Sequence, residues 1–262
     1  MELKLPESLA RLVKGYKFIK DEIGLSPTNV YKLINDKHAI YLKTSSRQFK
    51  NTTYDVEREK EVLNWLEGKL PVPRVLHFER GEDFNYLLMS EVEGSCLSQV
   101  GDVSPGKLVE LYAESVERLQ RIDITDCPHS SDVKLRLSEL DYLLNSKLAA
   151  EEDFWEGDTK NRFASPEMLV SYLKDNIPDE DFVFSHGDLC SSNIITSNGI
   201  VNGYVDWARG GKADKWYDIA FCVRNIRAEL MDEKYVKLFF DILDIKPDWE
   251  KIDYFILLDE LF

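Results

Sequence analysis

The sequence lacks both an apolar run long enough to span a membrane and an apolar N-terminal segment typical of a secretory signal. A membrane helix needs about 18 consecutive apolar residues, and no stretch of the 262 residues approaches that length. The N-terminus, MELKLPESLARLVKGYKF, mixes charges of both signs with isolated apolar residues. We therefore expect a cytoplasmic protein with no membrane partner.

Cysteine is scarce, and its spacing indicates neither a metal site nor a disulfide framework. The four cysteines are Cys96, Cys127, Cys190 and Cys222, and no two of them form a CxxC pair. Free thiols are therefore the expected state. A reactive thiol at Cys190 stays an alternative, with His186 as the group that would activate it.

Positive charge is in deficit. The chain has 33 Lys and Arg residues against 48 Asp and Glu residues, a formal net charge of −15. Such a chain repels nucleic acid and anionic membranes and attracts cations. Two acidic clusters also contain aromatic rings: EEDFWEGD at 151–158, and the C-terminal DELF. Each cluster could be solvated surface or part of a pocket for a cation.

A complete glycine-rich G-x-G-x-x-G phosphate loop is absent as well. The segment between the expected strands YKFIK and NVYKLIN instead contains the turn-forming residues Gly24, Ser26, Pro27 and Asn29. This segment could be a polar hairpin loop, or a loop whose backbone N–H groups and Ser26 hydroxyl face a nucleotide.

A strand and a helix in the first third of the chain predict a buried ion pair. In the expected strand AIYLKT, alternation puts Tyr41 and Lys43 on the same face. The expected helix 52–70 has an apolar stripe, and Glu59 falls on it. A carboxylate on a buried face costs several kcal/mol unless it is paired. Lys43 is the natural partner, as in kinases; the alternative is that Glu59 reaches water at the helix edge.

The segment from Val183 to Asp218 carries the residues that predict chemistry. His186, Asp188 and Asn193, followed by Asp206, reproduce the H-x-D-x-x-x-x-N pattern and later aspartate of phosphoryl-transfer enzymes. Asp188 would orient a hydroxyl group and accept its proton. Asn193 and Asp206 would offer oxygen atoms to Mg²⁺. A structural role is expected for His186, which braces the loop.

The pattern of strands and helices predicts two parts. Strands dominate up to YLLMSE at 86–91, and after EVEG the composition becomes helical. We expect an N-lobe over 1–92 that binds nucleotide, and a C-lobe over 93–262 with the catalytic loop, the metal site and the acceptor pocket. The expected C-lobe helices are 105–122, 133–148, one that begins at Ser165 and Pro166, and helices at about 215–229, 232–243 and 248–261.

Several motifs of this chain resemble the aminoglycoside 3′-phosphotransferases over nearly the whole sequence. They are HGDLCSSN, VDWARGGKADKWYDIAF, ILLDELF, TTYDVEREK, WLEGKLPVPRVLHFER and LLMSE. The resemblance implies an α+β, two-lobed, protein-kinase-like fold, with a small β-rich N-lobe and a larger, mostly helical C-lobe. It implies ATP and Mg²⁺ as cosubstrates and transfer of the γ-phosphoryl group to the 3′-hydroxyl of kanamycin- or neomycin-type drugs. Some members also act at a 5″-hydroxyl.

The resemblance further implies roles for individual residues. For nucleotide binding these residues are Ser26, Tyr41, Lys43, Glu59 and Met89; for catalysis, Asp188; and for Mg²⁺, Asn193 and Asp206. For the aminoglycoside they are Asp153, Glu156, Arg224, Glu229, Asp259, Glu260 and Phe262, with His186 and Arg209 as structural support. Trp207 has no role that the resemblance implies.

Two alternatives remain at this point. One is a kinase of another small hydroxylated cation, such as choline, which would need an aromatic cage. The other is a nucleotide-binding module without catalysis, which would be expected to lack at least one of Lys43, Asp188, Asn193 and Asp206; all four are present. The sequence leaves the oligomeric state open.

Overall fold

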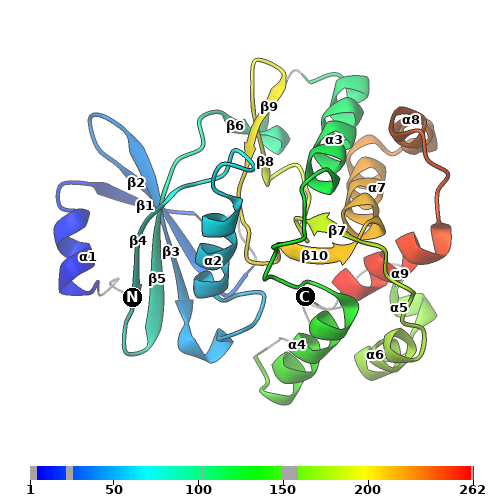
Figure 1. Ribbon diagram of the computed structural model, residues 1–262, viewed down its shortest axis with the longest axis horizontal. Helices are drawn as coiled ribbons and strands as arrows, with labels where there is room; N and C mark the ends of the chain where they lie inside the picture. Colours follow the sequence, from blue (N-terminus) through cyan, green and yellow to red (C-terminus); the bar gives the residue numbers. More distant parts are fainter. Residues whose placement is uncertain (1–4, 22–25, 102, 149–158, 261) are drawn as a thin grey trace. The chain divides into compact units, whose positions relative to one another are not determined.

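The computed structural model describes the chain except for residues 1–4, 22–25, 102, 149–158 and 261 (Figure 1). The chain forms two compact units, each described here by itself. The first comprises Met1–Gly94 and Asn202–Ala208; the second comprises Ser95–Val201 and Arg209–Phe262. Strands dominate the first and helices the second, which confirms the α+β class. Nucleotide binding by 1–92 and catalysis by 93–262 stay predictions.

An antiparallel five-stranded sheet with the order β1-β2-β3-β5-β4 forms the first unit. Its strands are β1 (Lys17–Lys20), β2 (Asn29–Ile34), β3 (Ala39–Ser46), β4 (Val75–Arg80) and β5 (Phe84–Ser90). The helices are α1 (Glu7–Leu12) and α2 (Val56–Leu66), with a short 3₁₀ turn, η1 (Arg47–Phe49).

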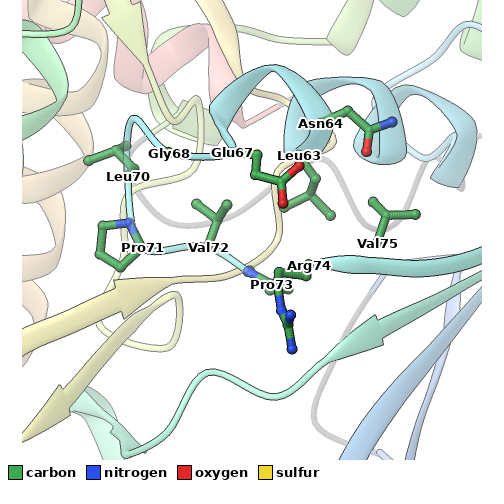
Figure 2. Close-up of a pocket in the computed structure, with 10 residues that line it drawn as sticks. All are labelled: Leu63, Asn64, Glu67, Gly68, Leu70, Pro71, Val72, Pro73, Arg74 and Val75. Atoms are coloured by element: carbon green, nitrogen blue, oxygen red, sulfur yellow. The ribbon is translucent and has the colours of Figure 1, made fainter.

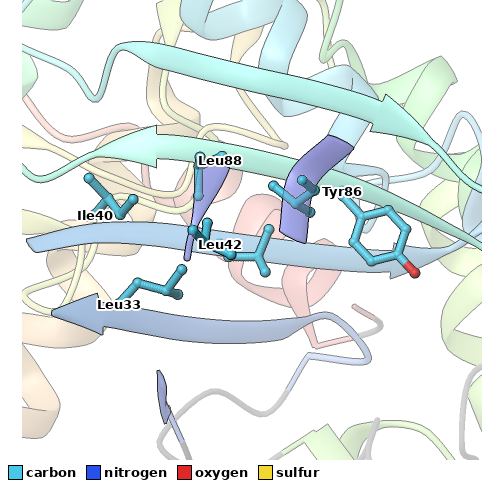
Figure 3. Close-up of a cluster of buried hydrophobic side chains, with 7 residues drawn as sticks. Leu33, Ile40, Leu42, Tyr86 and Leu88 are labelled. Carbon is cyan, nitrogen blue, oxygen red and sulfur yellow. The ribbon is translucent and has the colours of Figure 1, made fainter. Parts of the chain in front are cut away.

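One face of the sheet packs against α1. Leu33, Ile40, Leu42 and Leu88 are buried together with Leu9 of α1, and Figure 3 shows the strand residues of this cluster side by side. Cross-strand register pairs Leu33 with Ile40 and Leu42 with Leu88, so successive apolar positions fall on the same face. The alternation therefore leaves Lys43 on the opposite face, as predicted.

Helix α2 is shorter than the predicted 52–70. Asp55 caps it by accepting the Glu57 N–H at 3.0 Å, so the helix begins at Val56. It ends at Leu66, two residues before Gly68, whose φ is +78°. Residues 52–55, which were predicted to be helical, lie in the turn that precedes the helix.

A distant segment, Asn202–Ala208, completes the first unit. The Tyr204 N–H donates to the carbonyl of Pro71 at 3.1 Å. A Cβ atom at Gly203 would lie 2.7 Å from that same carbonyl oxygen, so only glycine allows this approach. The strand β9 (Ile200–Tyr204) is thus held beside Pro71, and Asp206 lies just beyond its end.

The second unit is mostly helical. Its helices are α3 (Pro105–Gln120), α4 (Val133–Asn145), α5 (Thr159–Arg162), α6 (Pro166–Asp175), α7 (Trp216–Leu230), α8 (Glu233–Leu243) and α9 (Trp249–Asp259), and a 3₁₀ turn, η2 (Leu97–Gln99), precedes them. Its strands are β6 (Ser95–Cys96), β7 (Phe182–Ser185), β8 (Ile194–Ser197) and β10 (Gly211–Asp214), together with the start of β9. β7 pairs antiparallel with β10 and β6 with β8.

The predicted helices of the second unit are confirmed, with ends that differ by one to a few residues. Side-chain caps set their starts: Ser104 precedes Pro105, and Ser165 precedes Pro166. In the part of the chain that the structure describes, no helix has both the length and the apolar character needed to cross a bilayer.

The start of α4 depends on a partly buried acid. Asp132 accepts the Leu135 N–H at 2.8 Å, and Glu180 accepts the Val133 N–H at 3.1 Å. Burial, aided by the charges of Asp132 and Asp214, raises the pKa of Glu180 to about 7, although the Val133 N–H and Lys251 oppose the shift. Between about pH 4.5 and 7, Glu180 is therefore protonated in the folded chain and ionised in the unfolded chain.

We expect the free energy of unfolding to fall as pH rises from about 4.5 to about 7, because the unfolded state binds fewer protons in that window. Glu180→Gln keeps an acceptor for the Val133 N–H and should remove about 1 kcal/mol of this decline, a value discounted for partial exposure. Urea unfolding at several pH values measures both proteins. An identical decline in the two would show that Glu180 titrates normally.

Candidate functional site

The first unit holds a buried lysine between two carboxylates. Lys43 Nζ lies 2.9 Å from Glu59 Oε1 and 2.9 Å from Asp206 Oδ1. The side chains of Lys43 and Glu59 are 9% and 2% exposed, whereas that of Asp206 is 49% exposed. The predicted pairing of Lys43 with Glu59 is confirmed, and the alternative of Glu59 in water is wrong.

Charge balance explains how this lysine tolerates burial. Burial alone lowers the pKa of Lys43, but the negative charges of Asp206 and Glu59 outweigh it and hold the pKa above its usual value. Lys43 is therefore a permanent ammonium group. Removal of Glu59 would leave part of this charge uncompensated, an effect that commonly costs about 3–5 kcal/mol for a buried pair. Removal of Asp206, which is half-exposed, would cost less because water screens its charge.

Trp207, which had no predicted role, fastens the Asp206 segment to the same site. Its backbone N–H donates to Glu59 Oε1 at 3.2 Å, and its indole Nε1 donates to the carbonyl of Tyr204 at 3.1 Å. The indole ring is fully buried, edge to face with the Tyr204 ring at 6.2 Å. Trp207 therefore positions its neighbour Asp206, whose backbone is left-handed with φ +65°.

The other predicted nucleotide residues of this unit lie on or beside the sheet. Tyr41 and Met89 are cross-strand partners, and Met89 is buried. The register puts them on the sheet face of Lys43, since strand residues two apart share a face. Ser26 is exposed ahead of β2, with its hydroxyl 2.5 Å from that of Thr28.

A pocket of about 220 Å³ lies elsewhere in the first unit (Figure 2). Its lining runs from Leu63 in α2 through the connecting segment to Val75 at the start of β4. Lys43, Glu59 and Asp206 do not line it, so this pocket is separate from the buried lysine.

In the second unit, Asp188 and Asn193 lie together in the loop between β7 and β8. Asn193 Nδ2 donates to the backbone carbonyl of Asp188 at 2.9 Å and to its Oδ2 at 3.1 Å. The amide nitrogen is thereby engaged, and the amide oxygen is the atom suited to ligate a metal ion. Asp188 thus offers an oriented carboxylate, and Asn193 offers an amide oxygen that could ligate a metal ion.

A buried carboxylate that sequence reasoning missed fixes the start of this loop. Asp218, in the first turn of α7, accepts the backbone N–H groups of His186 at 2.8 Å and Gly187 at 3.0 Å. Burial raises the pKa of Asp218, and the charge of His186 and these hydrogen bonds oppose the rise. His186 is itself fully buried, which fits a bracing role. An acid in the first turn of a predicted helix was the available signal.

The thiol of Cys190 is not poised to react. Burial, together with the negative charge of Asp188, raises the pKa of Cys190 to about 12. Its Sγ lies 3.0 Å from the Ser192 hydroxyl. The reactive-thiol alternative is therefore wrong, because a thiolate would be required.

The predicted acceptor residues fall into two groups. Asp259 is bound by two arginines: its Oδ1 lies 2.7 Å from Arg209 Nη1, and its Oδ2 bonds to Arg224. Glu229 accepts hydrogen bonds from the hydroxyl groups of Tyr112 at 3.0 Å and Ser191 at 2.7 Å.

Phe262 and Glu260 follow α9. The Phe262 ring lies 5.6 Å from the Arg209 guanidinium, and Glu260 is partly exposed. Asp153 and Glu156 lie outside the described residues. The roles of all these residues in binding an acceptor stay predictions.

Comparisons with known proteins agree over the whole chain. Residues 18–255 match the model of the "Phosphotransferase enzyme family". The sequence is 52% identical to an aminoglycoside 3′-phosphotransferase of Enterococcus faecalis, covering 100% of this chain and 99% of that one. It is 51% identical to one of Staphylococcus aureus, with the same coverage.

Solved structures show the same fold. A crystal structure of aminoglycoside-3′-phosphotransferase of type VIII superposes with a TM-score of 0.81 at 24% identity, covering 97% of both chains. An aminoglycoside phosphotransferase from Streptomyces rimosus, in complex with ADP and streptomycin, gives a TM-score of 0.81 at 23% identity, covering 97% and 95%. The predicted kinase-like fold, with an N-terminal antiparallel sheet and a helical C-terminal part, is confirmed.

Gly187 allows a close approach that no other residue would allow. Its φ is +78°, and an added Cβ atom would lie 2.5 Å from the Arg209 carbonyl oxygen. We expect Gly187→Ala to lower the free energy of unfolding by several kcal/mol, from backbone strain of about 1–3 kcal/mol plus this clash. Thermal or urea unfolding measures the loss.

Gly199→Ala is the matched control. Gly199 has a similar φ of +74°, but nothing lies within 4 Å of its added Cβ, so it carries the strain alone. Equal losses in the two variants would rule out a special constraint at Gly187.

Proposed function

The chain belongs to the aminoglycoside 3′-phosphotransferase family and is an ATP-dependent enzyme of antibiotic resistance; from that premise we propose which of its residues bind the nucleotide, the metal ion and the acceptor. The observation that carries the proposal is the pair of Asp188 with Asn193, in which a hydrogen bond orients the carboxylate. Phosphoryl transfer depends mainly on positioning and electrostatic stabilisation, so orientation of this kind is what the reaction needs.

Asp188 is the proposed catalytic base. The acceptor hydroxyl hydrogen-bonds to its carboxylate and passes its proton to it as the bond from oxygen to the γ-phosphorus forms. ADP is the leaving group. Asn193 holds Oδ2 of Asp188 throughout, which restricts rotation of the carboxylate.

The nucleotide belongs to the first unit in this proposal. Lys43, fixed by Glu59, binds phosphate oxygens as an ammonium group, and Ser26 supports the loop over them. Tyr41 stacks on the base, and Met89 lines the adenine site beside it. The ADP complex of the Streptomyces rimosus relative supports a nucleotide of this kind.

Asn193 and Asp206 are the proposed Mg²⁺ ligands. One amide oxygen and one half-exposed carboxylate fit a hard cation that retains water and phosphate ligands. Two protein ligands suffice for Mg²⁺, which usually retains water and takes substrate phosphates as its other ligands. When bound, Mg²⁺ neutralises charge on the phosphate oxygens.

The acceptor is an aminoglycoside phosphorylated at its 3′-hydroxyl, with the 5″-hydroxyl as the proposed second position. Several carboxylates serve its ammonium groups: Asp153, Glu156, Glu229 and Glu260, with the terminus at Phe262. Both oxygens of Asp259 already bind Arg209 and Arg224, so we propose that Asp259 holds these arginines rather than an ammonium group. The net charge of −15 suits a polycation.

Asp188→Asn should lower turnover by about 10²–10⁴-fold, the usual contribution of a general base, while the affinity for ATP stays within about threefold. ADP release measures turnover, and calorimetry measures nucleotide binding. Asp181→Asn changes an exposed residue just before β7 and should leave both unchanged. Near-normal turnover of Asp188→Asn would remove Asp188 from its role.

The same assay with a drug that lacks the 3′-hydroxyl tests the acceptor position. Wild-type enzyme should phosphorylate it only if it carries a 5″-hydroxyl. Choline serves as the acceptor for the remaining alternative, and ADP release with choline but not with any aminoglycoside would overturn the proposed function.

A further inference from the structure

Arg136 of α4 is a fully buried charged residue with no role in the proposed reaction. Its side chain is 0% exposed, and its Nη1 lies 3.2 Å from Oε2 of Glu139, which is also buried. Among the residues described, no hydrogen-bond partner is found for its Nε. A buried ion pair contributes little to stability compared with well-packed apolar residues, so stability alone is a weak explanation for this arginine. Its contacts indicate another purpose.

Arg136 first contacts the main chain beside the catalytic base. Its Nη2 donates to the carbonyl oxygen of Arg209 at 3.0 Å, which also accepts the Ser131 hydroxyl at 2.6 Å. This carbonyl oxygen, the Arg209 Cβ and the Arg136 Nη2 all crowd Gly187: an added Cβ would lie 2.5 Å, 2.8 Å and 3.0 Å from them. Arg136 therefore lies directly against the residue before Asp188.

Arg136 also contacts the end of the chain. Its guanidinium group lies 5.7 Å from the centre of the Phe262 ring, and that of Arg209 lies 5.6 Å from the same ring. A guanidinium group at this distance attracts an aromatic ring, and the attraction is stronger when water is excluded. Arg209 in turn binds Asp259. The Phe262 ring thus contacts two arginine side chains, and one of them, Arg136, donates a hydrogen bond to the backbone carbonyl of the other, Arg209.

We propose that Arg136 is a positioning residue that couples the acceptor-binding C-terminus to the main chain carrying Asp188. A shift of the Phe262 ring moves the guanidinium group, and through the Arg209 carbonyl it moves the backbone at Gly187. Binding of the acceptor at the C-terminus therefore sets the position of the base. This inference rests on the proposed function of Asp188 and of the C-terminal residues.

Arg136→Lys tests the coupling because it keeps the charge but loses the planar group that reaches Glu139, the Arg209 carbonyl and the Phe262 ring together. We expect about a tenfold rise in the KM of the aminoglycoside and a several-fold fall in kcat, with the KM of ATP within about twofold. Arg121→Lys, on an exposed arginine that follows α3, is the control and should change none of these constants.

A double-mutant cycle with Phe262→Ala separates coupling from loose packing. If Arg136 acts through the ring, the double variant should lose little more kcat/KM than the worse single variant. Losses that multiply, or an equal rise in the KM of ATP, would overturn the inference. If Arg136→Lys does not fold, Arg136→Met/Glu139→Gln removes both buried charges and should give the same split between the two KM values.

The outcome is distinguishable from a failure of the proposed function. Wild-type enzyme that phosphorylates aminoglycosides, together with the predicted loss of turnover in Asp188→Asn, upholds the proposed function whatever Arg136→Lys shows. Unchanged kcat and KM values in a folded Arg136→Lys variant would then contradict the proposed coupling and leave the proposed function intact.

Discussion

A buried ammonium group needs carboxylate partners, and the first unit is built to supply two of them to Lys43. The alternation of β3 points Lys43 away from the apolar cluster. The cap at Asp55 fixes where α2 begins, and the helix then directs Glu59 toward Lys43. Asp206 comes from a segment more than a hundred residues later, and Trp207 fastens that segment to Glu59. The residues that hold the unit together are therefore the ones that surround the proposed phosphate-binding lysine.

The second unit solves a different problem, the satisfaction of backbone groups in a tight loop. The N–H groups of His186 and Gly187 come just after the end of β7, and the carboxylate of Asp218 accepts a hydrogen bond from each. Gly187 permits the Arg209 carbonyl to approach, and Arg136 donates a hydrogen bond to that carbonyl. The carboxylate of Asp188 thus projects from a backbone that several buried side chains fix, the preorganisation on which positioning catalysis depends.

The periodicity of apolar residues and the positions of helix-capping residues predicted the helices and the sheet face of Lys43. The pairing of Lys43 with Glu59 followed from one strand face and one helix stripe, and the order His186, Asp188, Asn193 pointed to phosphoryl transfer. Contacts between distant segments could not be predicted in this way. No spacing in the sequence links Asp218 to His186, Arg136 to Arg209 or Trp207 to Glu59, because these hydrogen bonds join segments far apart in the chain. Charge favoured a cation, but only the resemblance identified the aminoglycoside.

The most direct test of this account is the nucleotide dependence of Glu59→Gln, since glutamine keeps an oxygen for the Trp207 N–H but removes the charge that holds Lys43. The account predicts a KM for ATP raised by about tenfold or more, with the KM of the aminoglycoside unchanged. Glu57→Gln, two residues earlier and paired with Arg80, should leave both constants as they are. An unchanged KM for ATP in a folded Glu59→Gln enzyme would contradict the central role of the buried lysine.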